Sequence, residues 1–430
     1  MLRRVDAVDP IAALRHRDFL VYLLGSFVSN TGNQMRTVAV GWEVYERTRE
    51  PISLGIVGLV LAVPVILLAL PAGAAADRHS RRRIIMWSQA GLALSGLGLA
   101  WASASGAPLP WTYLLLLATG ACRALGWPAA TAIVAGLVPA RTFPNAAMWR
   151  SVGFQLPATL GPLAGGFLLA RYATATVYAL DAVSSLVQVA ALATLRPTPH
   201  ARSAEPSSWR SLLEGIRYLA RHPIILSTMV LDMVAVMFGG ATALLPIYAN
   251  DILQVGPQGF GWLRAMPSMG AIAMSLVLAT RPPFRRAGRS LLVAVVVFGL
   301  ATIVFGLSKS YPLSLAALFA LGAADNVSVV IRATVLQLMT PDGMRGRVSA
   351  VGVIFIGTSN EIGELESGVV AQALKPWAGT PLNTVATVVI GGAATLATVA
   401  AVAAGWPALR RLGRLDELLP PDHPVEETTR

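Results

Sequence analysis

Ionisable side chains lie inside the apolar stretches of this 430-residue sequence, where such groups are unusual. Placing one in a membrane span costs about 2.5 to 3.5 kcal/mol on insertion scales. Each such group therefore needs an oppositely charged or hydrogen-bonding partner, contact with water, or a functional role. Glu361, Glu364 and Glu366 form the densest acidic group. Because close carboxylates in a medium of low dielectric repel each other and lose solvation, at least one is expected to bind a proton at physiological pH.

The spacing of these acids limits which of them can share a partner. At 100° per residue, Glu361 and Glu364 share one helix face, whereas Glu366 points about 140° away from Glu361. The hypothesis is that Glu361 or Glu364 exchanges a proton, while Arg36 or Arg264 supplies the countercharge. The alternative is that these charges form static ion pairs that hold helices together.

Other polar residues at membrane depth are predicted to line a cavity. Asp232 and Asp325 are expected to line it and to take part in proton exchange. The candidates for contact with a substrate are Asn30, Asn33, Gln34, Arg36, Arg123, Gln155, Arg264, Asn326 and Asn360. Trp42, Trp127, Trp149, Phe238 and Trp262 offer apolar or stacking surface, although packing and interface anchoring explain most such aromatics.

Long apolar stretches must position these residues. A hydrocarbon core of about 30 Å requires roughly 20 apolar residues per helix. Twelve spans are predicted at 19–46, 52–76, 82–103, 111–138, 143–170, 173–195, 223–250, 257–280, 290–308, 312–340, 346–373 and 380–406. With 55% hydrophobic and 13% charged residues, the chain is expected to be an all-α membrane protein with little room for a soluble domain.

The gaps between spans alternate in positive charge. Of the 34 Lys and Arg residues, 24 fall at the termini and in alternate gaps, 5 in the other gaps and 5 inside spans. The positive-inside rule places the crowded side, and with it both termini, in the cytoplasm. The net charge of +12 therefore indicates orientation and contact with anionic lipid headgroups, not nucleic acid.

The spans divide into two halves of six. The predicted organisation is a six-helix bundle at 1–195, a cytoplasmic linker with an interfacial helix at 196–222, a second bundle at 223–406 and a tail at 407–430. A displacement of 202 residues places the Gly-rich run 161–166 on 363–368 and sets Arg123 against Asp325. Two pseudo-symmetric six-helix bundles in one orientation are the architecture of many secondary transporters, which bind substrate between the halves.

The loop at 73–83 carries Gly, three small residues, Asp-Arg and a run of arginines. It resembles the cytoplasmic signature of the major facilitator superfamily, with Ser80 in place of the usual second Gly. The resemblance implies a latch, since Asp77 can accept charge-assisted bonds from arginines or cap a helix N-terminus. The alternative is that the arginines serve topology alone, which does not require Asp77. The predicted latch residues are Gly73, Asp77, Arg78, Arg81 and Arg82.

Gly161, Pro162, Gly165 and Gly166 are similar to the core of the antiporter motif of that superfamily, although Pro157 replaces another Gly. Glycines permit close helix approach and proline bends a helix, so the motif implies a gate and favours export; simple helix packing is the alternative.

Segments 32–46, 340–348 and 360–368 resemble the exporter branch that includes enterobactin and macrolide efflux proteins. Arg345 and Arg347 in the second segment are assigned to the cytoplasmic gate. The resemblance implies the major facilitator fold, a bacterial inner membrane location and proton-linked efflux of a siderophore or hydrophobic drug.

The sequence lacks the motifs that several other activities require. No Gly-x-x-x-x-Gly-Lys-Ser/Thr motif occurs, since Lys309 and Lys375 are the only lysines, so ATP hydrolysis is not expected. The single Cys122 and five scattered histidines predict no metal site, and neither a cofactor nor an enzymatic activity is expected. The expected partners are a small-molecule substrate, protons and lipid, and no oligomer is required. A nutrient importer or facilitator on the same fold, or a membrane sensor, scaffold or intramembrane enzyme, remains an alternative.

Overall fold

The computed structural model describes residues 9–196, 209–239, 242–282 and 284–414. These residues form helices and no strand, which confirms the predicted all-α class. Eight of the described helices are long and apolar enough to cross a membrane. A ninth candidate arises only if α8 and α9 are joined, and these meet at an angle of 106°.

Six long helices occupy the first six predicted spans, within about two residues at each end, except that the fourth helix ends at Ala132 and not at the predicted residue 138. They are α1 (Arg17–Thr48), α2 (Pro51–Arg78), α3 (Arg81–Ala104), α4 (Leu109–Ala132), α6 (Phe143–Leu169) and α7 (Thr174–Ala193). Short elements flank them: η1 (Ala13–Arg15), α5 (Val134–Leu137) and η2 (Ala140–Thr142). Both α4 and α6 contain internal prolines, which remove one helical hydrogen bond each.

The second half of the chain repeats this plan after the helix α8 (Trp209–Arg221). The long helices are α9 (Pro223–Phe238), α11 (Gly256–Ala279), α12 (Ala287–Leu307), α13 (Tyr311–Met339), α14 (Asp342–Ala378) and α15 (Leu382–Gly405). The short elements are α10 (Leu245–Ile247), the π-helical turn η3 (Tyr248–Ile252) and α16 (Pro407–Arg410).

The predicted end of the seventh span is also wrong, and by more residues. The seventh span was expected to continue to residue 250, but α9 ends at Phe238. A Cβ atom at Gly239 would lie 2.9 Å from the Cζ atom of Phe298, so a side chain does not fit where the helix ends. Glycine disfavours the helix interior by about 1 kcal/mol, and Pro246 cannot donate a helical backbone bond. The stretch is therefore apolar enough for a span without forming one continuous helix.

The chain forms two compact units. The N-terminal unit comprises Met1–Arg49, Val60–Ser207 and Val255–Ala265. The C-terminal unit comprises Glu50–Leu59, Ser208–Gln254 and Met266–Arg430. The beginning of α2 thus belongs with the C-terminal unit and the beginning of α11 with the N-terminal unit, a division that the linear span pattern does not reveal.

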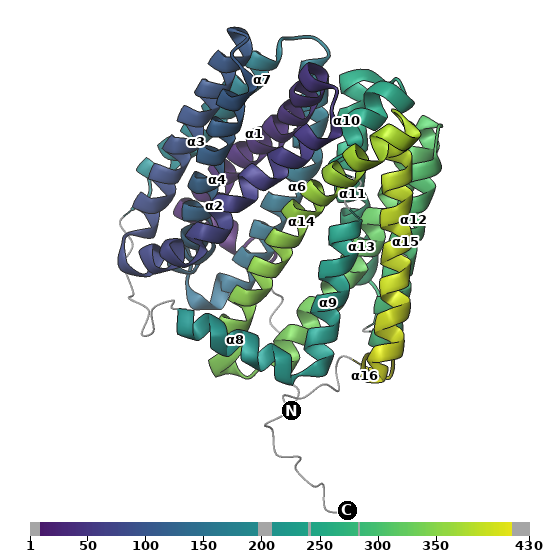
Figure 1. Ribbon diagram of the computed structural model, residues 1–430. Helices are drawn as coiled ribbons and strands as arrows, with labels where there is room; N and C mark the ends of the chain where they lie inside the picture. The colour runs from purple at the N-terminus through teal and green to yellow at the C-terminus, as the bar shows by residue number, and fades with distance from the viewer. Residues whose placement is uncertain (1–8, 197–208, 240–241, 283, 415–430) are drawn as a thin grey trace, which may run out of the picture. The chain divides into compact units, whose positions relative to one another are not determined.

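The two units pack their helices by the same rule (Figure 1). In the N-terminal unit α1 packs on α6 and α7, and α3 packs on α4 and α7. In the C-terminal unit α9 packs on α14 and α15, and α12 packs on α13 and α15. Five long helices of the first half, α1, α3, α4, α6 and α7, therefore have counterparts with equivalent neighbours in the second, as a pair of pseudo-symmetric bundles requires.

Candidate functional site

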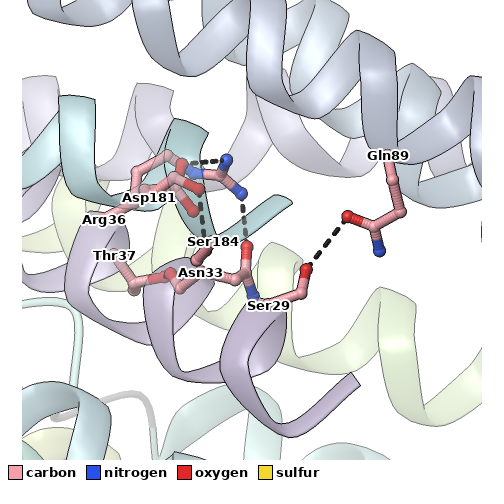
Figure 2. Close-up of polar contacts among 7 residues, drawn as sticks. All are labelled: Ser29, Asn33, Arg36, Thr37, Gln89, Asp181 and Ser184. Carbon is pink, nitrogen blue, oxygen red and sulfur yellow. Dashed lines mark hydrogen bonds and ion pairs between the residues drawn. The ribbon is translucent and has the colours of Figure 1, made fainter. Parts of the chain in front are cut away.

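A buried ion pair joins α1 to α7 in the N-terminal unit. Arg36 Nη1 lies 2.7 Å from Asp181 Oδ2, and the side chains are only 4% and 0% exposed. The Arg36 guanidinium also donates to the side-chain oxygen of Asn33, one turn earlier on α1 (Figure 2). Glycine makes this approach possible, because a Cβ at Gly32 would lie 2.8 Å from Ser184 Cβ and 3.1 Å from Asp181 Cα.

Further polar contacts extend this network along α1. Ser29 donates to Gln89 on α3 over 2.9 Å, and Ser184 donates to the backbone oxygen of Asp181 over 2.7 Å (Figure 2). Nearer the C-terminal end of α1, Tyr178 donates to Glu43 over 2.8 Å. Arg36 and Glu43 of α1 are therefore held by side chains of α7, and Ser29 by a side chain of α3.

A second charged cluster lies in the C-terminal unit. Asp232 on α9 forms an ion pair with Arg332 on α13, and their side chains are 8% and 12% exposed. Arg332 Nε also donates to the Ser328 hydroxyl over 3.2 Å, one turn earlier. Asp232, Asp325 and Ser328 line one small cavity of about 10 Å³. A void of roughly 10 to 15 Å³ by this measure holds about one water molecule.

The charge of this cluster is unbalanced. Two carboxylates, from Asp232 and Asp325, line the cavity, and Arg332 is the cation that pairs with the first of them. The rest of the wall is apolar and comes from α9, α12 and α13: Ala235, Val236, Ala294, Val295, Phe298 and Ala324. An apolar wall strengthens electrostatic interactions inside the cavity and penalises uncompensated charge.

The acids of α14 lie elsewhere. Glu361 and Glu364 are half-buried, and a Cβ at Gly58 on α2 would lie 2.8 Å from Glu364 Cβ and 3.0 Å from the Glu361 carbonyl oxygen. The Ser367 hydroxyl donates to Glu366 over 3.4 Å. None of the three acids lines the cavity between Asp232 and Asp325. The structure thus divides the five predicted proton-coupling acids into two groups.

The predicted countercharges also differ in their surroundings. The sequence suggested Arg36 as a countercharge for the acids of α14. In the structure, Arg36 forms an ion pair with Asp181 in its own unit. Arg264 on α11 is half-buried. Asp181 and Arg332 also lie inside predicted spans, but the sequence alone does not identify them as the partners of Arg36 and Asp232, since α1 and α7, or α9 and α13, must first be placed in register.

The glycines of the antiporter-like motif are contact points of α6. A Cβ at Gly161 would lie 2.8 Å from the Thr31 carbonyl oxygen on α1, and one at Gly165 would lie 3.1 Å from Met35 Cα. A Cβ at Gly166 would lie 2.8 Å from Gly261 Cα on α11. Pro162 is buried between them. These contacts demand small residues, as both a gate and simple packing would.

The arginines of the loop at 73–83 cap helices within the N-terminal unit. Arg81 donates to the carbonyl oxygen of Ala132 over 3.0 Å, and Arg82 donates to those of Ala193 and Leu195 over 2.7 Å each. Positive groups at helix C-termini are favourable because they satisfy unpaired carbonyls and the helix dipole. Gly73 and Asp77 are half-buried, and Arg78 is exposed.

The second predicted gate segment contacts the helix that follows the linker. Arg347 Nη1 at the start of α14 lies 2.8 Å from Glu214 Oε2 on α8. Gly215 next to it supports this approach, since a Cβ there would lie 2.9 Å from the Arg347 carbonyl oxygen. The side chain of Arg345 lies outside the described residues.

The remaining cavity candidates are spread over both units. Asn30, Gln34 and Gln155 are half-buried, and Asn360 is exposed. Asn326 is buried and accepts a bond from Ser275 over 3.1 Å. Arg123 is exposed although it lies in the middle of α4, and it has no ion pair or hydrogen bond with the described residues.

The family model described as transmembrane secretion effector matches residues 8–409. The chain belongs to this family. This match confirms the resemblance to the major facilitator superfamily that the loop and glycine motifs indicated. The chain is 25% identical to the enterobactin exporters EntS of Shigella boydii serotype 18 and Escherichia coli strain HS, over 87% of this chain and 90% of theirs.

Solved structures share the fold. A bacterial homolog of the human lysosomal transporter Spinster superposes with a TM-score of 0.69 at 16% identity, covering 92% of this chain and 96% of its own. The nucleoside transporter NupG gives a TM-score of 0.68 at 15% identity, covering 90% and 98%. With its apolar helices and bacterial relatives, the protein is a multi-pass transport protein of the bacterial inner membrane.

Proposed function

We propose that this protein exports a small molecule from the cytoplasm by alternating access and that proton antiport drives the export. Both termini lie in the cytoplasm in this proposal, as the distribution of arginines favours. The observation that carries it is the cavity in the C-terminal unit, where Asp232 and Asp325 share a wall and Arg332 is the paired cation.

The charge balance of this cavity explains how it could couple proton movement to transport. An ionised Asp232 paired to Arg332 is neutral as a unit, so an ionised Asp325 would add one uncompensated negative charge in an apolar surrounding. Binding one proton removes that charge. Water reaching the cavity from one side of the membrane can load the proton, and water from the other side can release it.

The acids of α14 provide a second group that could exchange protons during transport. Glu364 contacts the beginning of α2 at Gly58, in a helix pair that shares close glycine contacts. A Cβ at Gly368 would lie 2.8 Å from Gly55 Cα, so α2 and α14 approach at backbone distance there. Separation of these helices would admit water to Glu364, which would let its protonation follow the open state.

The direction of transport follows from two considerations. The glycine motif on α6 is similar to that of antiporters in the superfamily, and the relatives named enterobactin exporter act outward. The proposed cargo is accordingly a siderophore or a hydrophobic drug. A protein that took up nutrients would raise the content of a fluorescent cargo in expressing cells, whereas export lowers it.

Asparagine variants test proton coupling separately from transport itself. In inside-out vesicles with an imposed pH gradient, Asp325→Asn and Asp232→Asn are expected to lose at least tenfold of cargo accumulation, because no proton can be exchanged at an amide. Exchange of labelled for unlabelled cargo without a gradient should persist in Asp325→Asn, since no net proton movement is required.

Asp9→Asn is the matched control, because Asp9 forms a surface ion pair with Arg15 at the N-terminal end. It should accumulate cargo as the unmodified protein does. Full gradient-driven accumulation in both the Asp232 and the Asp325 variants would rule out this cavity as the coupling site.

A further inference from the structure

Two arginines of the N-terminal unit carry charge that no described residue balances. Arg123 in α4 is exposed and Arg150 in α6 is half-buried, and neither has an ion pair or hydrogen bond with the described residues. The other charged groups on the long helices of this unit include the pairs of Arg36 with Asp181 and of Arg47 with Glu43. The uncompensated charge away from the helix ends is therefore positive.

Both arginines face the protein side of their helices. On α4, Arg123 lies within about 40° of the buried residues Leu116 and Thr119, and about 160° to 180° from Leu114 and Leu125, which are exposed. Unpaired guanidinium groups are strongly disfavoured in lipid. A charged Arg123 side chain at this position therefore requires water or a polar ligand beside it and not acyl chains.

The same geometry holds for α6. Arg150 lies within about 60° of the buried residues Gly153 and Pro157, and a Cβ at Gly153 would lie 2.8 Å from Leu23 on α1. The exposed residues Val152 and Leu156 point about 120° to 160° away from Arg150.

An aromatic contact joins the two helices at this level. Trp127 on α4 and Phe154 on α6 meet edge to face, with ring centroids 6.2 Å apart and an interplanar angle of 80°. Trp127 and Phe154 are each about half exposed, at 49% and 48%. Trp127 follows Arg123 by one turn and Phe154 follows Arg150 by one turn, so each guanidinium starts about 6 Å along its helix from the ring pair.

Because α4 and α6 are consecutive spans and run in opposite directions, the two arginines flank the ring pair on its two sides. We propose that Arg123, Trp127, Phe154 and Arg150 form a recognition patch for a cargo that is an aromatic anion. The guanidinium groups bind a carboxylate or phenolate oxygen with charge-assisted bonds, and the half-exposed rings stack on the aryl group. An aromatic cation would meet two unbalanced positive charges, and an aliphatic anion would leave the rings unused.

This inference rests on the proposed export function and narrows its cargo. The direct test uses a matched set of probes in the purified full chain and in inside-out vesicles: 2-naphthoate, its neutral amide 2-naphthamide, the saturated anion decalin-2-carboxylate, and the aromatic cation ethidium. We expect 2-naphthoate to bind at least tenfold more tightly than the amide or the saturated acid, and to accumulate in energised vesicles.

Variants assign the binding to the patch. Arg123→Gln and Arg150→Gln are each expected to weaken 2-naphthoate binding about tenfold or more, because each removes a charge-assisted contact. Trp127→Leu should weaken it several-fold, and Trp127→Phe should restore most of the loss. Arg171→Gln and Trp101→Leu, which change an arginine and a tryptophan outside the patch, should leave binding unchanged.

The outcomes separate the cargo inference from export itself. Gradient-driven transport of ethidium but not of 2-naphthoate would overturn the aromatic-anion cargo and leave proton-driven export standing. Binding of 2-naphthoate that depends on Arg123, without gradient-driven movement of any probe, would support the patch and contradict the proposed coupling. Equal binding of 2-naphthoate to the unmodified protein and to Arg123→Gln, in a monodisperse preparation, would overturn the patch.

Discussion

At the scale of single residues, charge pairing decides what each ionisable group can do. Arg36 lies at membrane depth, as the sequence indicated, but its guanidinium is occupied by Asp181 and Asn33. Arg332 pairs with Asp232 in a similar way. Arg123 and Arg150 have no such partner among the described residues. The first two arginines therefore serve structure or coupling, and the last two are available to bind a cargo.

Removing one partner of the Arg36–Asp181 pair is expected to lower the free energy of unfolding far more than replacing both partners by apolar residues. Asp181→Ala leaves a buried guanidinium without its countercharge and should lower the free energy of unfolding by about 3 to 5 kcal/mol. The double variant Arg36→Met with Asp181→Leu removes both charges and should recover most of that loss. Thermal unfolding of the purified protein in detergent measures both; equal destabilisation in the single and double variants would show that the pair is not held by charge.

At the scale of helices, glycine positions set how closely neighbours approach. Gly32 brings α1 against α7, Gly166 brings α6 against α11, and Gly55 with Gly368 brings α2 against α14. These contacts place Arg36 beside Asp181 and Glu364 beside α2. The polar residues are thus positioned by small residues a turn away from them.

Adding one methyl group tests this dependence. Gly32→Ala should destabilise the protein by about 1 to 3 kcal/mol, since its Cβ would lie 2.8 Å from Ser184 Cβ and the helices would have to separate. Gly343→Ala is the comparison, because nothing lies within 4 Å of a Cβ at that position of α14. It should be neutral or slightly stabilising, as alanine favours a helix. Similar losses in both variants would mean that helix approach at Gly32 is not limiting.

Helix positions could be predicted from the sequence, whereas side-chain partners could not. Runs of about 20 apolar residues bounded by arginines located the long helices closely, apart from the C-terminal ends of α4 and α9, because the membrane fixes both length and composition. The helix α9 ends earlier because Gly239 and Pro246 act locally within an apolar run. Asp181 lies 145 residues from Arg36, and its pairing depends on how α1 and α7 pack, which periodicity alone does not specify.

At the scale of the whole molecule, the two units share one packing rule and differ in charge. α1, α3, α4, α6 and α7 of the first unit correspond to α9, α12, α13, α14 and α15 of the second. The displacement that relates them sets the unpaired Arg123 against Asp325 on the cavity wall. The two units thus carry a cation, Arg123, and an acid, Asp325, at matching helix positions. This difference agrees with the proposal that one unit binds the cargo and the other binds the proton.

Proton movement driven by cargo alone tests the central claim most directly. In liposomes that contain the purified protein and a pH-sensitive dye, with no imposed pH gradient, an outward cargo gradient should move protons in the opposite direction to the cargo. Asp325→Asn should abolish the dye signal while cargo still equilibrates. Cargo flow with an unchanged dye signal in that variant, or with no proton movement in the unmodified protein, would contradict the account.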